Sequence, residues 1–237
     1  MKYLFTVFAI ACIFNLGKAQ TNTAYDQFLQ TCLTNVRSLK SIEDKDLENR
    51  PEGTPYLYNK WLNSELSITY EENKSTQNLK VLIDMELNQI NVRLLNNQLG
   101  VVPLKYVDTL AISPAIGVNH VYIVRPISLV EGKNEEKLSL YQTFESEKVV
   151  FLKRTQKVFS RAKVDGYGNS SAIDEYGELF RYYVSEKGKD KYSKIKLNKK
   201  SLQKALPRYK NKIESLAKKM KTNFKSEAEI AKLLAAL

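Results

Sequence analysis

The chain of 237 residues contains a single histidine and two cysteines, and this scarcity excludes several classes of site. His120 has no second histidine and no cysteine cluster near it in the sequence, so the usual ligands of a zinc or iron site are missing. A Ser/His/Asp triad or a Cys/His pair would have to use this same residue. The sequence also lacks a phosphate-binding glycine loop and a Gly-x-Ser-x-Gly elbow. We therefore expect no cofactor and no metal, and the sequence supports no enzyme class.

Long apolar runs are also missing, except at the start of the chain. Lys2 precedes an apolar run over residues 3–14, and a triplet of mostly small residues ends at Ala19. This three-part pattern is typical of a secretory signal peptide, and the run is shorter than the roughly 20 residues that span a bilayer. An uncleaved anchor and a lipoprotein signal at Cys12 are the alternatives. We predict cleavage after Ala19 and export to the periplasm or outer envelope, with no transmembrane span left afterwards.

Cleavage would remove Cys12 and leave Cys32 as the one remaining cysteine. An internal disulfide is then excluded, and the fold has to rest on its hydrophobic core. Cys32 lies on the apolar stripe of an amphipathic helix predicted over residues 23–40, where a lone cysteine is usually a small buried hydrophobe.

The clearest structural pattern lies at residues 79–95. Apolar and polar residues alternate up to Leu87, and the alternation resumes at Ile90 after Asn88 and Gln89. A period of two, interrupted by an asparagine, predicts an antiparallel hairpin with one buried face. Similar short runs continue to residue 197, so we expect about seven to nine strands.

The predicted fold class is α+β, dominated by an antiparallel meander that forms a curved sheet, a sandwich or a partly closed barrel. An N-terminal amphipathic helix and C-terminal helices complete it. The expected organisation is a signal peptide over residues 1–19, a helix and linker over 20–52, a β domain over 53–197 and a basic helical segment over 198–237. In this last segment, Pro207 suits the start of a second helix, and Ser226 with Glu229 suits the start of a third.

Positive charge gathers close to the C-terminal end. Residues 187–225 contain fifteen Lys and Arg but only two acidic residues, Asp190 and Glu214. Such a cluster attracts anionic partners, and lysines beside an apolar stripe can lie against a membrane. We expect contact with an envelope protein or an anionic membrane surface, and because of export we expect no nucleic acid. The residues expected to make the contact with an envelope protein or membrane surface are Lys199, Lys200, Lys204, Arg208, Lys210, Lys212, Lys218, Lys219 and Lys221. A solvated helix that aids solubility is the alternative.

Carboxylates offer a weaker catalytic pattern. Asp84 and Glu86 would project from the same face of the predicted hairpin, and Asp108 lies in a later strand. Paired carboxylates can act as acid and base or hold a cation. Without a recognisable motif, a solvated strand face is the simpler interpretation.

Several short motifs resemble a family of uncharacterised exported proteins of Gram-negative envelopes. They are Gly-Thr-Pro-Tyr-Leu at 53–57, Glu-Gly-Lys at 131–133, Leu-Ser-Leu-Tyr at 138–141, Phe-Leu-Lys-Arg at 151–154, Tyr-Tyr-Val at 182–184 and Ile-Lys-Leu-Asn-Lys-Lys-Ser-Leu at 195–202. The Tyr-Asn ending associated with that family is missing here. The resemblance implies export and a β-rich body followed by helices, and it implies no activity.

We therefore expect a non-catalytic envelope module that binds a partner or an anionic surface. A carrier that holds a small apolar molecule in a β cup is the alternative. An envelope hydrolase built on Asp84, Glu86 and Asp108 comes third.

Overall fold

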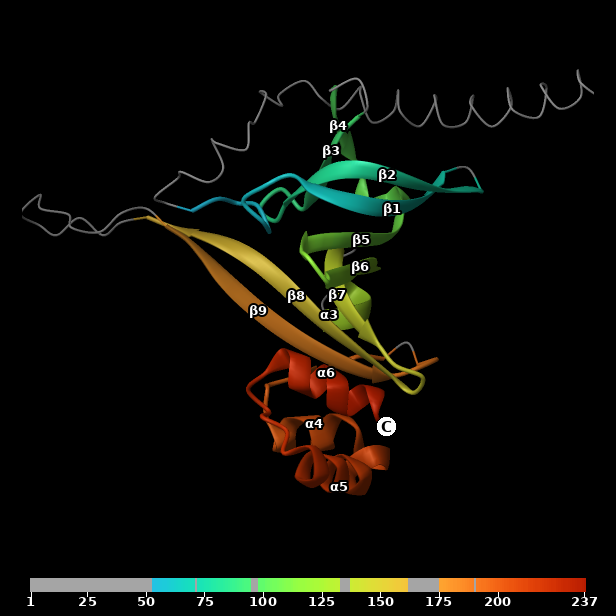
Figure 1. Ribbon diagram of the computed structural model, residues 1–237, viewed down its shortest axis with the longest axis vertical. Helices are drawn as coiled ribbons and strands as arrows, with labels where there is room; N and C mark the ends of the chain where they lie inside the picture. Colours follow the sequence, from blue (N-terminus) through green and yellow to red (C-terminus); the bar gives the residue numbers. More distant parts are fainter. Residues whose placement is uncertain (1–52, 71, 95–97, 133–136, 162–174, 190) are drawn as a thin grey trace, which may run out of the picture.

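The strands of the chain join into one antiparallel sheet, followed by a group of short helices (Figure 1). The computed structural model describes residues 53–70, 72–94, 98–132, 137–161, 175–189 and 191–237. The predicted signal peptide and the predicted helix at 23–40 lie outside these residues.

Ten strands pair in the order β10-β9-β8-β7-β6-β5-β1-β2-β3-β4. Their bounds are β1 (Leu62–Tyr70), β2 (Asn73–Asp84), β3 (Gln89–Arg93), β4 (Leu99–Val102), β5 (Val107–Ala115), β6 (Val118–Pro126), β7 (Leu138–Glu145), β8 (Val149–Ser160), β9 (Glu175–Glu186) and β10 (Ser193–Ile195). The antiparallel prediction is confirmed, although the number of strands was underestimated. The sheet is open, so a closed barrel is not formed.

The hairpin predicted at residues 79–95 is formed by β2 and β3. Asn88 adopts a left-handed conformation (φ 55°) in the turn, as asparagine tolerates better than most residues. Asp84 lies at the end of β2, where its Oδ1 accepts hydrogen bonds from the backbone N–H groups of Glu86 and Leu87 at 3.0 and 2.8 Å. The asparagine and this aspartate together fix the turn.

A short connection forces one end of the sheet to curl. In a flat sheet β4 and β5 would lie four strand spacings apart, about 19 Å. The link between them is the 3₁₀ turn η1 (Leu104–Tyr106), and a link of this length and conformation reaches only about 13 Å. Strands β1–β4 must therefore roll up until β4 comes back toward β5. We call β1–β6 the curled end.

The inner face of the curled end is filled by its own side chains. Leu66 on β1 lies opposite Leu110 on β5, which lies opposite Tyr122 on β6, and all three are buried. Apolar residues of the predicted hairpin pack against them, as the alternation indicated. The buried members from the hairpin are Leu79, Val81, Ile83, Ile90, Val92 and Leu94.

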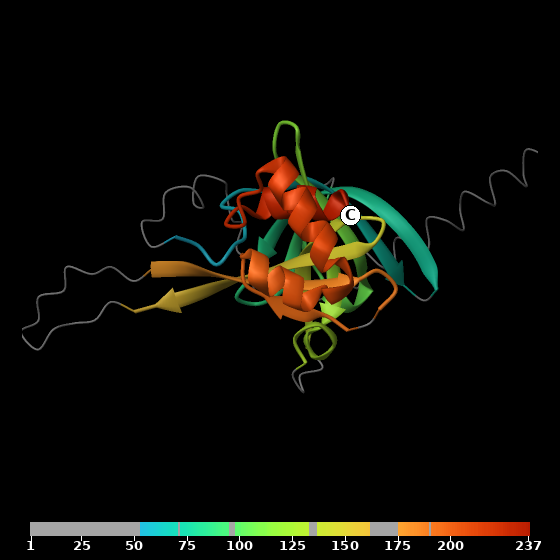
Figure 2. The same ribbon diagram turned by 90° about the horizontal axis from the view of Figure 1, so that it is seen from below.

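The same inner face is covered differently at the other end of the sheet. Here Phe151 on β8 and Val184 on β9 pack against α4 (Lys199–Ala205), α5 (Lys210–Met220) and α6 (Glu227–Ala235). Figure 2 shows these helices lying over the strands. We call residues 198–237 the helical end.

The helix starts predicted from sequence are confirmed. Pro207 occupies the first position of η2 (Pro207–Tyr209), which runs directly into α5. Ser226 caps α6 by accepting a hydrogen bond from the backbone N–H of Glu229. The Asn198 side chain caps α4 in the same way through Ser201.

One further helix, α3 (Ile127–Glu131), was not predicted. Pro126 ends β6 and supplies the extended residue before the helix, and Gly132 ends it in a left-handed conformation (φ 67°). Five residues are too few to show a helical period, which explains the miss. The helix packs on the outer face, where the carboxylate of Glu131 accepts from Arg154 at 2.5 Å and Arg181 at 3.4 Å.

None of the helices in the described part of the chain is long and apolar enough to span a membrane.

The packing of the helical end predicts its contribution to stability. Ile213 is fully buried on α5, so Ile213→Ala should lower the free energy of unfolding by about 3 kcal/mol. Met220→Ala, at a side chain 41% exposed on the same helix, should cost less than about 0.5 kcal/mol. Both free energies can be measured by urea unfolding monitored through the fluorescence of Trp61, the one tryptophan, which lies next to β1 in the curled end. An unchanged midpoint for Ile213→Ala would show that the two ends unfold separately.

Candidate functional site

A row of polar side chains crosses the inner face between the two hydrophobic clusters. Tyr122 on β6, Gln142 on β7, Lys153 on β8 and Tyr182 on β9 lie directly opposite one another in successive strand pairs. Polar residues on a face that is otherwise apolar need partners when they are buried. We call this row and the side chains bonded to it the inner polar row.

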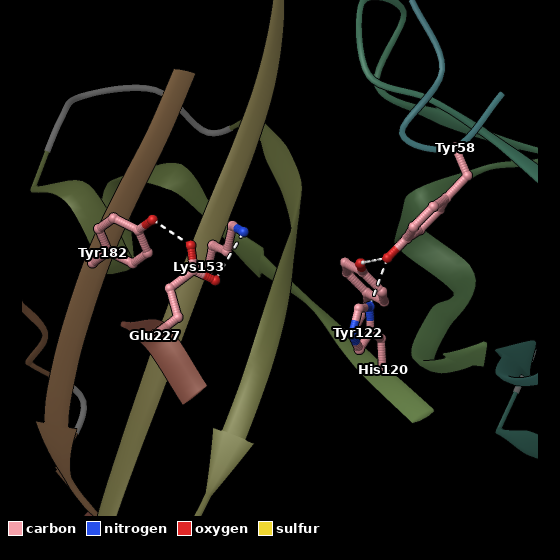
Figure 3. A network of polar contacts seen from close by, with 6 residues as sticks. All are labelled: Tyr58, His120, Tyr122, Lys153, Tyr182 and Glu227. Atoms are coloured by element: carbon pink, nitrogen blue, oxygen red, sulfur yellow. Dashed lines mark hydrogen bonds and ion pairs between the residues drawn. The ribbon is translucent and has the colours of Figure 1, made fainter. Parts of the chain in front are cut away.

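One half of the inner polar row is a cluster of two tyrosines and the histidine (Figure 3). The Tyr58 hydroxyl lies 2.6 Å from His120 Nδ1 and 3.2 Å from the Tyr122 hydroxyl. Burial lowers the pKa of His120, and the nearby Lys153 ammonium lowers it further. The imidazole is therefore neutral near pH 7, and Nδ1 can accept the proton of Tyr58.

Both tyrosine hydroxyls of this cluster keep their protons at neutral pH, because burial raises the pKa of Tyr122 and of Tyr58. Either hydroxyl can donate in the contact between Tyr58 and Tyr122, and the tautomer of His120 decides whether Nδ1 accepts from Tyr58 or donates to it. The cluster ties the segment before β1 to β6.

The other half of the inner polar row joins the sheet to the helical end. Glu227, in the first turn of α6, accepts hydrogen bonds from Lys153 at 2.9 Å and from the Tyr182 hydroxyl at 2.5 Å (Figure 3). Lys153 also lies 4.2 Å from the centre of the Phe180 ring. A carboxylate at a helix N-terminus is favoured by the helix dipole, so Glu227 stabilises both α6 and its contact with the sheet.

The chemistry of the inner polar row is that of hydrogen bonding and ion pairing. Tyr58, His120 and Tyr122 contact one another, and Lys153 and Tyr182 both bond to Glu227. In the described part of the chain, no three His, Cys, Asp or Glu residues gather where they could hold a metal ion. We therefore assign the row a structural role.

The three carboxylates considered for catalysis do not form one site. Asp84 is buried in the β2–β3 turn, whereas the exposed Glu86 accepts a hydrogen bond from the Tyr176 hydroxyl at 2.9 Å. Asp108 accepts from Thr69 at 2.7 Å and lies 3.8 Å from Lys74 at the opposite end of β2. The stretch of strand between Lys74 and Asp84 is about 33 Å long.

The expectation of a solvated strand face was therefore wrong for Asp84. Burial raises its pKa, while hydrogen bonds from the turn oppose that shift. The side chain serves the turn, a role that period-two alternation cannot reveal.

The cations predicted as contact residues all lie in the helical end, and most of them face solvent. Lys200 and Lys204 on α4, Arg208 on η2, and Lys210 and Lys219 on α5 are exposed. None of these five forms an ion pair with another described residue. Lys221, just after α5, is also exposed.

Three of the predicted contact residues have partners within the fold. Lys199 forms an ion pair with Glu214 at 2.7 Å, and Lys218 lies 3.9 Å from the same carboxylate. The Lys212 ammonium donates to the backbone oxygen of Leu237. Lys199 joins α4 to α5 and Lys212 joins α5 to the end of the chain after α6, whereas Lys218 pairs within α5; the three therefore contribute less to an exposed charged surface than the other six.

Sequence reasoning missed the inner polar row. Tyr58 and His120 are 62 residues apart, and Lys153 and Glu227 are 74 apart. The one available signal in the sequence was Lys153, a charged residue that interrupts the apolar alternation around Phe151 in β8.

Comparison with known proteins identifies no relative. No protein-family model matches the chain, and neither a curated protein nor a solved structure matches it. The function has to be argued from the chain itself.

The lowered pKa of His120 predicts a pH effect on stability. The unfolded chain has the ordinary histidine pKa of about 6.5 and binds a proton before the folded chain does. The contribution of neutral His120 to the free energy of unfolding should therefore be fully present above about pH 6.5 and should fall as the pH drops below that value. Urea unfolding at several pH values between 7.5 and 5.5 measures this fall.

His120→Asn provides the control, because its amide oxygen can accept from Tyr58 without titrating. Since His120 is the one histidine, this variant should lose most of the pH dependence in that range. An equal fall in both proteins would contradict the assignment of a neutral, half-buried imidazole.

The contact of Glu227 with the sheet predicts a second effect on stability. Glu227→Leu would leave the ammonium of Lys153, whose side chain is 15% exposed, without its carboxylate, so the free energy of unfolding should fall by about 2 kcal/mol. Glu229→Leu, on the same helix but facing the preceding loop, should cost about 1 kcal/mol or less. Equal effects of the two substitutions would mean that the contact between Lys153 and Glu227 contributes nothing specific.

Proposed function

We propose that the chain is a non-catalytic, exported binding module whose helical end attaches to an anionic surface of the cell envelope. This proposal rests on one observation, namely that the helices bury apolar side chains and expose cationic ones. Most of their apolar side chains are buried against β8–β10, whereas Lys200, Lys204, Arg208, Lys210 and Lys219 are exposed.

The folded arrangement fixes these cations in space. Asn198 caps α4, and Leu202, Leu206 and Ile213 anchor α4, η2 and α5 in the core. Lys200 and Lys204 are four residues apart on α4 and so share one side of it. Figure 1 shows α4 and α5 at the end of the molecule farthest from β1 and β2. The helical end thus holds six exposed cations on ordered elements, Lys200, Lys204, Arg208, Lys210, Lys219 and Lys221, which we call the cationic surface.

The same packing determines how attachment would occur. An amphipathic helix that enters a membrane uses its apolar side, but here that side forms the core. Met220 is the one large apolar side chain exposed among the described residues of the helical end. Attachment would therefore be electrostatic adsorption without insertion, and salt would weaken it.

The two other functions expected from sequence receive less support. A carrier needs space inside its β cup, but the inner face of the curled end is filled by fully buried residues such as Leu66, Ile90 and Leu110. A hydrolase built on Asp84, Glu86 and Asp108 lacks a shared site, because those carboxylates lie apart. An envelope protein with an acidic face remains an alternative occupant of the cationic surface.

Sedimentation of the exported chain with vesicles tests the proposal. The protein should bind vesicles rich in phosphatidylglycerol but not those of phosphatidylcholine alone, and salt should reverse the binding. The triple variant Lys200→Glu, Lys204→Glu, Arg208→Glu should bind at least about tenfold more weakly, since each cation near an anionic membrane contributes about 1 kcal/mol.

A matched triple variant, Lys60→Glu, Lys74→Glu, Lys105→Glu, changes the net charge equally at the curled end. It should retain most of the binding. Indifference to lipid charge, or an equal loss in both triple variants, would contradict attachment through the helical end.

A further inference from the structure

A groove lies across the strands of the curled end, and Leu79 and Leu94 of the hydrophobic cluster there contribute to its lining beside polar residues. Its volume is about 680 Å³, within the range of small-molecule binding sites. The lining comes from β1, β2, β3, β5 and β6. We call it the outer groove. The residues that matter for its chemistry are Asn63, Glu65, Asn78, Lys80, Arg93 and Asn119.

Two cations stand side by side in the outer groove. Lys80 on β2 lies directly opposite Arg93 on β3, and Asn63 on β1 lies directly opposite Lys80. Residues directly opposite on antiparallel strands have Cβ atoms about 5 Å apart, and like charges at that distance repel each other. An oxyanion placed between them would be attracted to both cations and would accept hydrogen bonds from them.

The position of Arg93 is fixed by an aromatic ring. Its guanidinium carbon lies 4.5 Å from the centre of the Trp61 ring, and Trp61 is buried against Tyr56 and Leu82. A stacked guanidinium loses little freedom on binding a ligand, because its plane is already held. Lys80 is exposed and forms no ion pair with another described residue, so its ammonium is available.

The rest of the outer groove suits hydroxyl groups. The Asn63, Asn78 and Asn119 amides each offer donors and an acceptor, and the exposed carboxylate of Glu65 offers acceptors. Leu79, Leu94 and Ala111 also line the groove, so its polar groups stand beside apolar surface against which the ring faces of a sugar can pack. A chain of sugar rings presents hydroxyls on every side and fits an open groove of this kind.

We propose that the outer groove binds an acidic oligosaccharide, with one sugar carboxylate held between Lys80 and Arg93 and the neighbouring hydroxyls held by the asparagines. This inference is independent of the proposed attachment through the helical end, because the two surfaces share no residue.

Titration of the full exported chain with trigalacturonate, followed by NMR, tests the inference. The side-chain amide signals of Asn63, Asn78 and Asn119 should shift. Maltotriose, a neutral trisaccharide of similar length, should cause much smaller shifts, as should inorganic phosphate, which lacks the sugar rings.

Two substitutions that change the net charge equally distinguish binding in the outer groove from a general effect of charge. Lys80→Glu should weaken trigalacturonate binding about tenfold, which corresponds to the loss of one hydrogen bond to a charged group. Lys60→Glu, at an exposed residue outside the groove lining, should change it less than about twofold. Trp61 fluorescence checks that both variants are folded.

Three outcomes would overturn the inference. Maltotriose could bind as tightly as trigalacturonate, Lys80→Glu could have no more effect than Lys60→Glu, or the shifted signals could belong to α4 and α5. The triple variant Lys200→Glu, Lys204→Glu, Arg208→Glu should bind trigalacturonate like the unchanged chain, so loss of vesicle binding and loss of sugar binding are distinguishable.

Discussion

The inner face of a single sheet has to be covered along its whole length, and the rest of the structure depends on how this is done. At the curled end the short link through η1 brings β4 back toward β5, so the sheet covers its own inner face. At the other end β8–β10 are too few to curl in this way, and α4–α6 supply the cover. Two hydrophobic clusters result, and the inner polar row fills the interval between them.

This division explains why many of the C-terminal lysines are exposed on ordered helices. Because Leu202, Ile213 and Leu233 are used in the core, the helices have one orientation and their cations point outward. Glu227 adds a specific contact, since it receives both Lys153 and Tyr182 from the sheet. The cationic surface therefore follows from packing as much as from composition. The outer groove lies in the same curled end, since β1, β2, β3, β5 and β6 supply its lining.

Local patterns predicted most of the described elements. The alternation around Val81 and Val92 correctly indicated the hairpin, and Pro207 and Ser226 marked the starts of η2 and α6. Contacts between distant residues were not predictable, because strand order and register are absent from local periodicity. The burial of Asp84, the pairing of His120 with Tyr58, and the row through Lys153 all depend on that order. The contact residues proposed in the helical end rested on charge counting, which cannot show that Lys199, Lys212 and Lys218 are engaged within the fold.

Hydrogen exchange of the backbone amides tests the central claim most directly, namely that the helical end is an integral part of the sheet's core. Amides within α5 and α6 should be protected to a degree similar to those of β8 and β9, because one hydrophobic cluster holds them all. Exchange of the α5 and α6 amides at the rate of an unfolded chain, while β8 and β9 remain protected, would show a detached basic tail and would contradict the account.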